Sequence, residues 1–260
     1  MRLEGRRALV TGGGRGIGRA IALAFAREGA DVAVAARTKA EVDAVAGEIE
    51  ALGGRGVSLT CDVGISAEVE KNVREAEGRL GGVDILVANA GSLMHAAVRE
   101  TTDEMWEEMI RVNLSSVFWA TRAAIGSMIE GGWGRIIAMS SVSGKVGGAN
   151  RSVYHAAKHG VIGFVRSAAL EVAERGVTVN AICPGFVDTK MIADSRKDFA
   201  RYGGGNRGEK ETLARLRDEI PMKRFLEAEE IASMAVYLAS EDARGVTGQA
   251  FTISAGSVQA

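Results

Sequence analysis

The chain has 260 residues, a length that one α/β domain can arrange around a single hydrophobic core. Hydrophobic residues make up 47% and charged residues 25%, and the formal net charge is −1, so the composition offers no electrostatic footprint for nucleic acid or for acidic membranes. The charged N-terminus lacks the apolar core of a signal peptide and no run approaches a membrane-spanning length, so we expect a cytoplasmic protein.

Short apolar runs alternate with longer amphipathic stretches along the first half of the chain. The runs RRALVTG, DVAVAA and VDILVANAG are continuous, which is typical of strands covered on both faces of a parallel sheet. Helical patterns over 16–29, 38–52 and 66–80 separate the strands and indicate right-handed βαβ units. We therefore predict the α/β fold class: a doubly wound, Rossmann-like parallel sheet of seven strands in a single domain that covers residues 1–260.

The second half continues the alternation with GRIIAMSS, a helical segment from about 151 to 175, GVTVNAICPG, EAEEIASMAVYLAS and GQAFTIS. The segment from about 188 to 226 breaks this pattern, and we interpret it as a substrate lid in which RYGGGNRG supplies flexible backbone. Its ten Lys/Arg against seven Asp/Glu would suit the phosphate of coenzyme A or of a carrier-protein phosphopantetheine, although solvated helix faces produce the same count.

The glycine-rich loop LVTGGGRGIG lies between the first strand and the first helix. Gly12, Gly16 and Gly18 let the backbone approach a ligand closely, and the helix N-terminus offers free N–H groups to a pyrophosphate. The spacing G-x-x-x-G-x-G differs from the commoner G-x-G-x-x-G, and a glycine cluster alone could be a simple turn. Its place after a strand and before a helix predicts a dinucleotide site.

Two arginines indicate which dinucleotide is bound. An acidic residue at the end of the second strand would hold the ribose 2′-hydroxyl of NAD, whereas an arginine accommodates a 2′-phosphate. This chain has Ala36 and then Arg37 at that point, and Arg15 inside the glycine loop is a second cation. Two arginines without a carboxylate favour NADP(H) over NAD(H).

The stretch SVYHAAKHG places Tyr154 and Lys158 four residues apart among small residues that favour a helix. These positions share a helix face, so we expect the phenol to lie beside the ammonium. A phenol has a reference pKa of about 10, and a neighbouring ammonium stabilises the phenolate. The pair alone also fits a helix without catalytic function, but beside a cofactor loop it predicts acid/base catalysis.

We expect the histidines near Tyr154 and both cysteines to have structural and not catalytic roles. His155 points about 100° around the helix from Tyr154 and His159 packs on the helix, so neither is expected to catalyse, and no ligand spacing predicts a metal site. Cys61 and Cys183 end apolar runs, so we expect buried free thiols.

Six motifs in order carry a family resemblance: TGGGRGIG at 11–18, NAG at 89–91, Asn113 in RVNLSSVF, MSSVSG at 139–144, YHAAK at 154–158 and NAICPGFVDT at 180–189. The chain resembles the short-chain dehydrogenase/reductase family along essentially its whole length. Within that family it is similar to the ketoreductase branch, which includes 3-oxoacyl thioester reductases and aromatic polyketide ketoreductases. One departure is Ser254 and Ala255 where the last strand usually ends near DGG, a region of subunit contacts.

The resemblance implies roles for individual residues. Ser141, which lies 13 residues before Tyr154, corresponds to the catalytic serine, and Asn113 corresponds to the asparagine that holds a water in a proton relay. The implied catalytic set is Asn113, Ser141, Tyr154 and Lys158. The implied cofactor-binding set is Gly12, Gly14, Arg15, Gly16, Ile17, Gly18, Arg37, Asp62, Val63, Asn89, Ala90, Gly91, Tyr154, Lys158, Pro184, Gly185, Val187 and Thr189.

The expected reaction is the reversible, NADPH-dependent reduction of a ketone to a secondary alcohol, with Tyr154 as the proton donor. A 3-oxoacyl thioester or an apolar or cyclic ketone is the expected substrate, and the expected pocket walls are Leu93, Met94, Val146, Phe186, Met191 and Ile192. The apolar residues of EMWEEMIRVNLSSVFWA are expected in the core or at an interface, because in the family this helix and the one that carries Tyr154 form a four-helix dimer contact. A homotetramer is the family expectation.

Three alternatives stay open. The first is an NAD-dependent dehydrogenase of secondary alcohols or 3-hydroxyacyl compounds. The second is a nucleotide-sugar epimerase or dehydratase, which uses a similar Tyr/Lys pair but normally needs a larger C-terminal substrate domain. The third is a non-catalytic NADP-binding subunit or redox sensor, in which the complete polar set would have no purpose.

Overall fold

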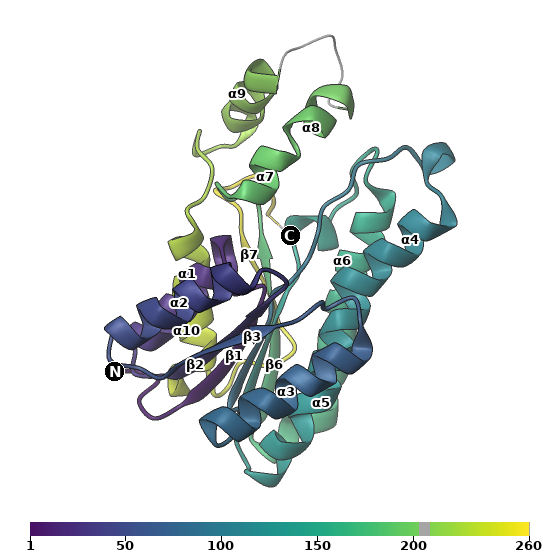
Figure 1. Ribbon diagram of the computed structural model, residues 1–260. Helices are drawn as coiled ribbons and strands as arrows, with labels where there is room; N and C mark the ends of the chain where they lie inside the picture. Colours follow the sequence, from purple (N-terminus) through teal and green to yellow (C-terminus); the bar gives the residue numbers. More distant parts are fainter. Residues whose placement is uncertain (203–208, 260) are drawn as a thin grey trace.

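A computed structural model describes residues 1–202 and 209–259 and confirms the predicted fold class (Figure 1). All paired strands run parallel in one seven-stranded sheet with the order β3-β2-β1-β4-β5-β6-β7. The strands are β1 (Arg7–Thr11), β2 (Asp31–Ala36), β3 (Gly56–Thr60), β4 (Ile85–Ala88), β5 (Gly134–Met139), β6 (Val177–Pro184) and β7 (Ala250–Ile253). The central strands β5 and β6 are buried along their whole length, which explains why they read as continuous apolar runs.

Helices cover both faces of the sheet (Figure 1). One face carries α1 (Gly16–Arg27), α2 (Lys39–Ala51) and α10 (Ala228–Ala239), and the other carries α3 (Ser66–Leu80), α5 (Ser116–Glu130) and α6 (Ser152–Val172). Each layer encloses its own apolar cluster, with Phe25 and Ile231 fully buried in one and Leu9 and Ile136 in the other. Burying such a side chain contributes about 1.5–3 kcal/mol, and these clusters hold the helices against the sheet.

The remaining helices lie at or above the carboxyl edge of the sheet or join longer elements. They are α4 (Asp103–Ile110), α7 (Lys190–Asp194), α8 (Arg196–Tyr202), α9 (Glu209–Glu219) and the short helices η1 (Val98–Glu100), η2 (Arg111–Ser115), η3 (Val142–Gly144), η4 (Ala173–Arg175) and η5 (Glu241–Ala243). No helix in the described ranges is long and apolar enough to cross a membrane.

The strand order reverses between β1 and β4, and this reversal positions the site. The chain runs outward from β1 through β2 to β3, then returns to β4 on the other side of β1. Ligands of doubly wound sheets bind outside the carboxyl ends of the strands at such a switch point. The loop from β1 into α1 and the segment that follows β4 therefore meet there.

The predicted lid stands above this edge, where Figure 1 shows α7, α8 and α9. Parallel bridge partners Val187 and Leu226 close its base, because Leu226 donates from its backbone N–H to Phe186 at 2.8 Å and Asp188 donates to Leu226 at 2.9 Å. The glycines of RYGGGNRG lie in 203–208, outside the described residues, so their expected flexibility stays a prediction.

Both cysteines are free thiols in the interior, as the sequence predicted. Cys61 and Cys183 follow or end buried strands, and burial raises the pKa of Cys61 to about 12. A thiol with such a pKa stays protonated near neutrality and is unreactive.

Candidate active site

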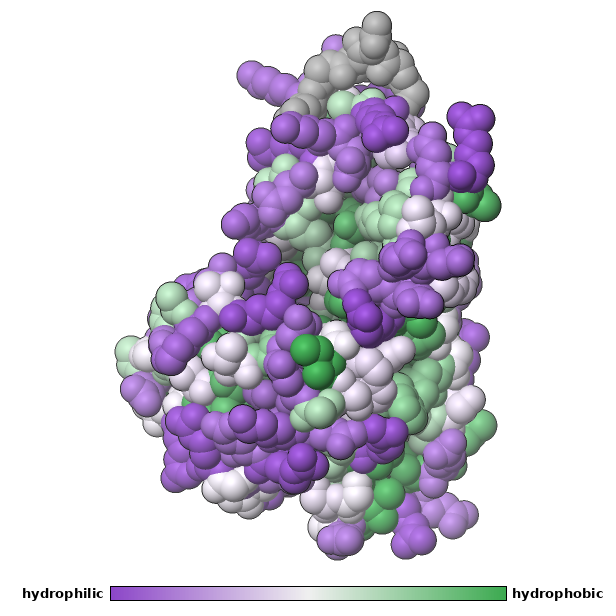
Figure 2. Space-filling model, turned by 45° about the vertical axis from the view of Figure 1, so that its right-hand side comes forward, coloured by the Kyte–Doolittle hydropathy of each residue, from purple (hydrophilic) through white to green (hydrophobic). Residues whose placement is uncertain are grey.

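A cavity of about 480 Å³ opens at the carboxyl edge of the sheet, beneath the lid helices. In Figure 2, pale and green side chains lie in a hollow below the helices at the top of the molecule, and hydrophilic side chains flank it. Every residue that the sequence assigned to catalysis or to the cofactor lines this cavity. The fold thus gathers these residues from the ends of β1, β2, β3, β4, β5 and β6, from the turn η2 and from α6.

The glycine loop lies against the segment that follows β4. A Cβ at Gly18 would lie 2.2 Å from the Gly12 carbonyl oxygen and 2.6 Å from Asn89 Nδ2, so no side chain fits there. Asn89 closes this contact, because its amide donates to the Thr11 carbonyl at 2.9 Å and its backbone N–H donates to the Thr11 hydroxyl at 3.0 Å. The start of α1 is thereby left open to a ligand phosphate.

The outer end of the cavity holds the polar residues expected at the adenosine. Arg15 and Arg37 are exposed at the rim, and Asp62 follows β3, where its carboxylate accepts from Gly64 N–H at 2.9 Å. Glu41 also lies here, with its Oε1 3.4 Å from Arg15 Nη1. The sequence indicated two arginines without a carboxylate, but the first turn of α2 brings the carboxylate of Glu41 beside Arg15.

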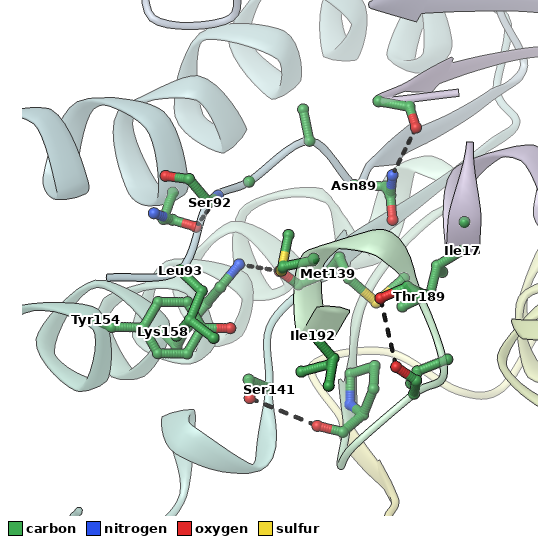
Figure 3. Close-up of a pocket in the computed structure, with 18 of the residues that line it drawn as sticks. Ile17, Asn89, Ser92, Leu93, Met139, Ser141, Tyr154, Lys158, Thr189 and Ile192 are labelled. Atoms are coloured by element: carbon green, nitrogen blue, oxygen red, sulfur yellow. Dashed lines mark hydrogen bonds between the residues drawn. The ribbon is translucent and has the colours of Figure 1, made fainter. Parts of the chain in front are cut away.

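Tyr154 and Lys158 share one face of α6, as the spacing predicted (Figure 3). The Lys158 ammonium lies 5.8 Å from the centre of the Tyr154 ring. Ser141, at the end of β5, forms a hydrogen bond with the Tyr154 hydroxyl and donates from its own hydroxyl to the Pro184 carbonyl at 3.5 Å. The phenol and a hydroxyl therefore point to one place in the cavity.

Burial controls the protonation of this pair. Burial raises the pKa of Tyr154, while the Ser141 hydroxyl and the Arg151 charge lower it by less. Burial also lowers the pKa of Lys158 to about 8, and its ammonium donates to the Met139 carbonyl at 2.9 Å. Lys158 was expected to lower the pKa of the phenol, but in this structure Ser141 and Arg151 do so, because the ammonium points toward β5.

Asn113 lies in η2, a π-helical turn between α4 and α5, and is fully buried. Such turns often occur at functional sites because they aim a side chain that a regular helix would not. Its Oδ1 accepts from Ser92 N–H at 3.2 Å and its Nδ2 donates to the Met109 carbonyl at 3.1 Å. A Cβ at Gly91 would lie 2.8 Å from Asn113 Oδ1 and 3.5 Å from Lys158 Nζ, so the two polar groups approach one point.

The predicted substrate walls are largely found. Leu93, Val146, Phe186, Met191 and Ile192 line the cavity, whereas Met94 is not among its lining residues.

The sequence analysis missed several lining residues, among them Glu41, Arg151, Ser257 and Val258. Arg151 was detectable, because it lies three residues before Tyr154, directly before the helix that carries it. Ser257 and Val258 carried no signal, since only the fold returns the C-terminal residues to this edge.

A dinucleotide fits these residues. Gly18 and Gly91 line the cavity where close contacts with neighbouring protein atoms exclude a side chain. A helix N-terminus faces the cavity, the two arginines lie at one end and Tyr154 lies at the other. Among doubly wound proteins, those with an acid/base group at the inner end of a dinucleotide cleft are the nicotinamide-dependent oxidoreductases, which is the class that fold and cleft define.

Comparison with known proteins narrows the class. Residues 6–200 match the family described as short chain dehydrogenase, and the chain belongs to this family. It is an oxidoreductase that acts on hydroxyl or ketone groups with a nicotinamide cofactor.

Two relatives and one solved structure match nearly the whole chain. The chain is 39% identical to the 3-oxoacyl-acyl-carrier-protein reductase FabG of Escherichia coli, with 98% of each chain covered. It is also 39% identical to a D-beta-hydroxybutyrate dehydrogenase of Cupriavidus necator, again with 98% of each covered. A crystal structure of a variant of actinorhodin polyketide ketoreductase with NADPH superposes with a TM-score of 0.93 at 37% identity and covers 97% of both chains.

Proposed function

We propose that this protein is an NADPH-dependent ketoreductase that reversibly reduces a ketone to a secondary alcohol. The observation that carries the proposal is the convergence of Ser141, Tyr154, Lys158 and Asn113 at the inner end of a dinucleotide-shaped cavity. A non-catalytic binding subunit would have no use for such a set.

The bound nicotinamide supplies the hydride for reduction. Ser141 and Tyr154 orient the substrate, because both hydroxyls face one point and can hydrogen-bond a carbonyl oxygen there. Tyr154 gives its proton to that oxygen as negative charge develops on it. Burial raises the pKa of Tyr154, so the phenol carries its proton near neutrality, and the Ser141 hydroxyl and the Arg151 charge oppose this rise and favour release of the proton.

Lys158 and Asn113 support the proton transfer. Lys158 holds a buried positive charge 5.8 Å from the centre of the Tyr154 ring, while Ser141 and Arg151 are the groups that lower the pKa of the phenol. Asn113 Oδ1 and Lys158 Nζ approach the same point near Gly91, which suits a water that reconnects Tyr154 with solvent. In alcohol oxidation the same groups act in reverse.

The proposed preference for NADPH rests on Arg15 and Arg37 at the outer end of the cavity. The similar actinorhodin ketoreductase was crystallised with NADPH, which supports the choice. The proposed substrate is a 3-oxoacyl thioester or an apolar or cyclic ketone, because Leu93, Val146 and Met191 give the inner end apolar walls.

The test follows nicotinamide absorbance when purified protein meets NADPH or NADH with acetoacetyl thioesters, cyclic diketones and simple ketones. We expect oxidation of NADPH with at least one of these ketones. Cofactor binding without turnover on any carbonyl would overturn the proposal in favour of a binding subunit.

Arg151 favours a second candidate, a dehydrogenase of short 3-hydroxy acids. It is the N-cap residue that precedes α6, where a positive charge is unfavourable, and it lines the cavity without an ion pair to any carboxylate of the described residues. A substrate carboxylate would supply its counterion, and the relative from Cupriavidus necator is named as a hydroxybutyrate dehydrogenase.

A pair of substrates decides between the two candidates. Acetoacetate and ethyl acetoacetate share the ketone but differ in charge. The second candidate predicts a kcat/KM for acetoacetate at least tenfold higher than for ethyl acetoacetate. Arg151→Gln should reverse this preference for acetoacetate. Arg166→Gln, at an exposed position further along α6, should keep it.

A further inference from the structure

Glu41 occupies an unusual position for an acidic residue at the outer end of the cavity. Its side chain lines the cavity together with Arg15, Arg37 and Thr38. Its Oε1 lies 3.4 Å from Arg15 Nη1, and its Oε2 lies 3.3 Å from the place of a Cβ at Gly14. A carboxylate thus lies against the phosphate loop, in the region where a ribose 2′-phosphate would need positive charge.

The sequence offers this carboxylate a different partner. Thr38 is the N-cap of α2 and Glu41 is its third helical residue, which is the T-x-x-E spacing of a capping box. In a capping box the Glu41 carboxylate would accept from the Thr38 backbone N–H. Thr38 makes no side-chain capping bond here, and the carboxylate faces Arg15 instead.

Helix α10 shows that the chain does form this motif elsewhere. Its N-cap Glu227 and third helical residue Glu230 make both bonds of a capping box, and Glu230 accepts from Glu227 N–H at 2.8 Å. Glu230 also pairs with Arg224 at 2.6 Å and keeps its capping bond, so an arginine partner does not by itself exclude the motif. At α2 the Glu41 carboxylate lies toward Arg15 of the β1–α1 loop, without the capping bond.

We propose that Glu41 sets the discrimination between NADP(H) and NAD(H) by occupying one of two positions, an inference that rests on the proposed cofactor site. On Arg15, the carboxylate neutralises one of the two cations and can accept a hydrogen bond from a free ribose 2′-hydroxyl. The 2′-phosphate of NADP(H) repels the Glu41 carboxylate and forms an ion pair with Arg15 in its place. The carboxylate then turns to the Thr38 N–H and completes the capping box.

We therefore expect the protein to bind both cofactors. Its preference for NADP(H) should be smaller than it would be if neither Arg15 nor Arg37 had a carboxylate beside it. The Arg15–Glu41 pair is partly exposed, so its loss changes binding only modestly. We expect Glu41→Gln to raise the ratio of NADP+ affinity to NAD+ affinity by about threefold to tenfold. The ratio rises because the phosphate meets no carboxylate and the ribose diol loses a charged acceptor.

The experiment measures Kd of NADP+ and NAD+ by titration calorimetry on the full chain, for the wild type and two variants of Glu41. Glu41→Gln removes the charge, and Glu41→Ala removes the capping group as well. Asp43→Asn is the matched control, since it removes an equal charge from the same helix, where Asp43 pairs with Lys39 and does not line the cavity. Circular dichroism checks that each variant is folded.

The outcomes separate this inference from the proposed function. A ratio that rises in Glu41→Gln and Glu41→Ala but changes less than 1.5-fold (roughly the error of such titrations) in Asp43→Asn supports the inference. An unchanged or lower ratio in the folded Glu41 variants overturns it, even if the wild type reduces ketones. A wild type that binds neither cofactor overturns the proposed function as well.

Discussion

The protonation of two buried groups governs the chemistry at the scale of single residues. The pKa of Tyr154 is raised and the pKa of Lys158 is lowered to about 8, and burial is the leading cause of both shifts. Each group is thus driven toward its neutral form, so the phenol carries its proton near neutrality. Burial of the charged Lys158 ammonium reduces the stability of the fold, and in the interior this ammonium donates a hydrogen bond to the Met139 carbonyl.

Tyr154→Phe tests the proton donor. We expect turnover to fall by about 10²- to 10⁴-fold, because the Ser141 hydroxyl that faces the same point is a much weaker acid than a phenol, whereas cofactor binding changes little. Steady-state rates and cofactor titration measure the two effects. Tyr237→Phe on α10 removes a phenol hydroxyl that does not line the cavity and serves as the control. Substantial activity in Tyr154→Phe would refute the assignment.

Lys158→Met tests the cost of the buried charge. Below about pH 8 the lysine is protonated in both the folded and the unfolded chain. Burying the charged ammonium then lowers the free energy of unfolding by the full amount of about 3 kcal/mol. As pH rises from about 8 to 10.5 the unfolded chain binds more protons, and the wild type gains stability. We expect the variant to be inactive but more stable than the wild type at pH 7 by about 1–2 kcal/mol, with the difference vanishing toward pH 10.

Urea unfolding at pH 7 and pH 10 measures this difference. Lys71→Met on an exposed part of α3 is the control and should show no pH-dependent gain. A Lys158→Met protein less stable than the wild type at pH 7 would show that the hydrogen bond to Met139 outweighs the cost of burial.

At the scale of elements, the site depends on how closely turns at the carboxyl edge approach one another. The β1–α1 loop contacts the segment after β4 so tightly that a Cβ at Gly18 would overlap the Gly12 carbonyl. The glycine spacing in the sequence predicted a phosphate loop, and the close contact gives the physical reason for the glycine. The partner in that contact, Asn89, was predicted only through the family resemblance.

Gly18→Ala tests this contact. We expect cofactor affinity to fall by more than about tenfold, since the methyl group must displace the Gly12 backbone that faces the phosphates. Titration with NADP+ measures the loss. Gly47→Ala inside α2, where a Cβ meets no atom within 4 Å, is the matched control and should raise stability by about 0.5–1 kcal/mol without changing affinity. Equal losses in both variants would contradict the explanation.

At the scale of the whole molecule, apolar side chains remain exposed on the helices that pack beside α6. Trp106 on α4 is 47% exposed, Phe118 on α5 40% and Leu170 on α6 81%. Phe164 of α6 packs against Phe118 with ring centres 6.0 Å apart, so the apolar surface is continuous from α5 to α6. Trp106 and Phe118 were expected in the core or at an interface, and their exposure favours an interface.

We expect the wild type to assemble as a homotetramer through this surface and the double variant Phe118→Glu, Leu170→Glu to assemble less. Two carboxylates per chain would have to be buried at the interface, which is costly without partners. Light scattering after size exclusion measures the mass of each. Leu52→Glu at the end of α2, an exposed leucine on the opposite helix layer, should leave the mass unchanged. A double variant with the wild-type mass would place the interface elsewhere.

The sequence by itself determined the sheet, its parallel strands and most of the site, because these follow from periodicity, glycine spacing and ordered motifs that are local in the chain. Tyr154 and Lys158 share a helix face for the same local reason. Only the tertiary structure decided which side chains meet across elements. It brought Glu41 to Arg15, turned the Lys158 ammonium to Met139 and returned Val258 to the cavity. Such contacts depend on how helices pack on the sheet, and a linear pattern carries no record of that packing.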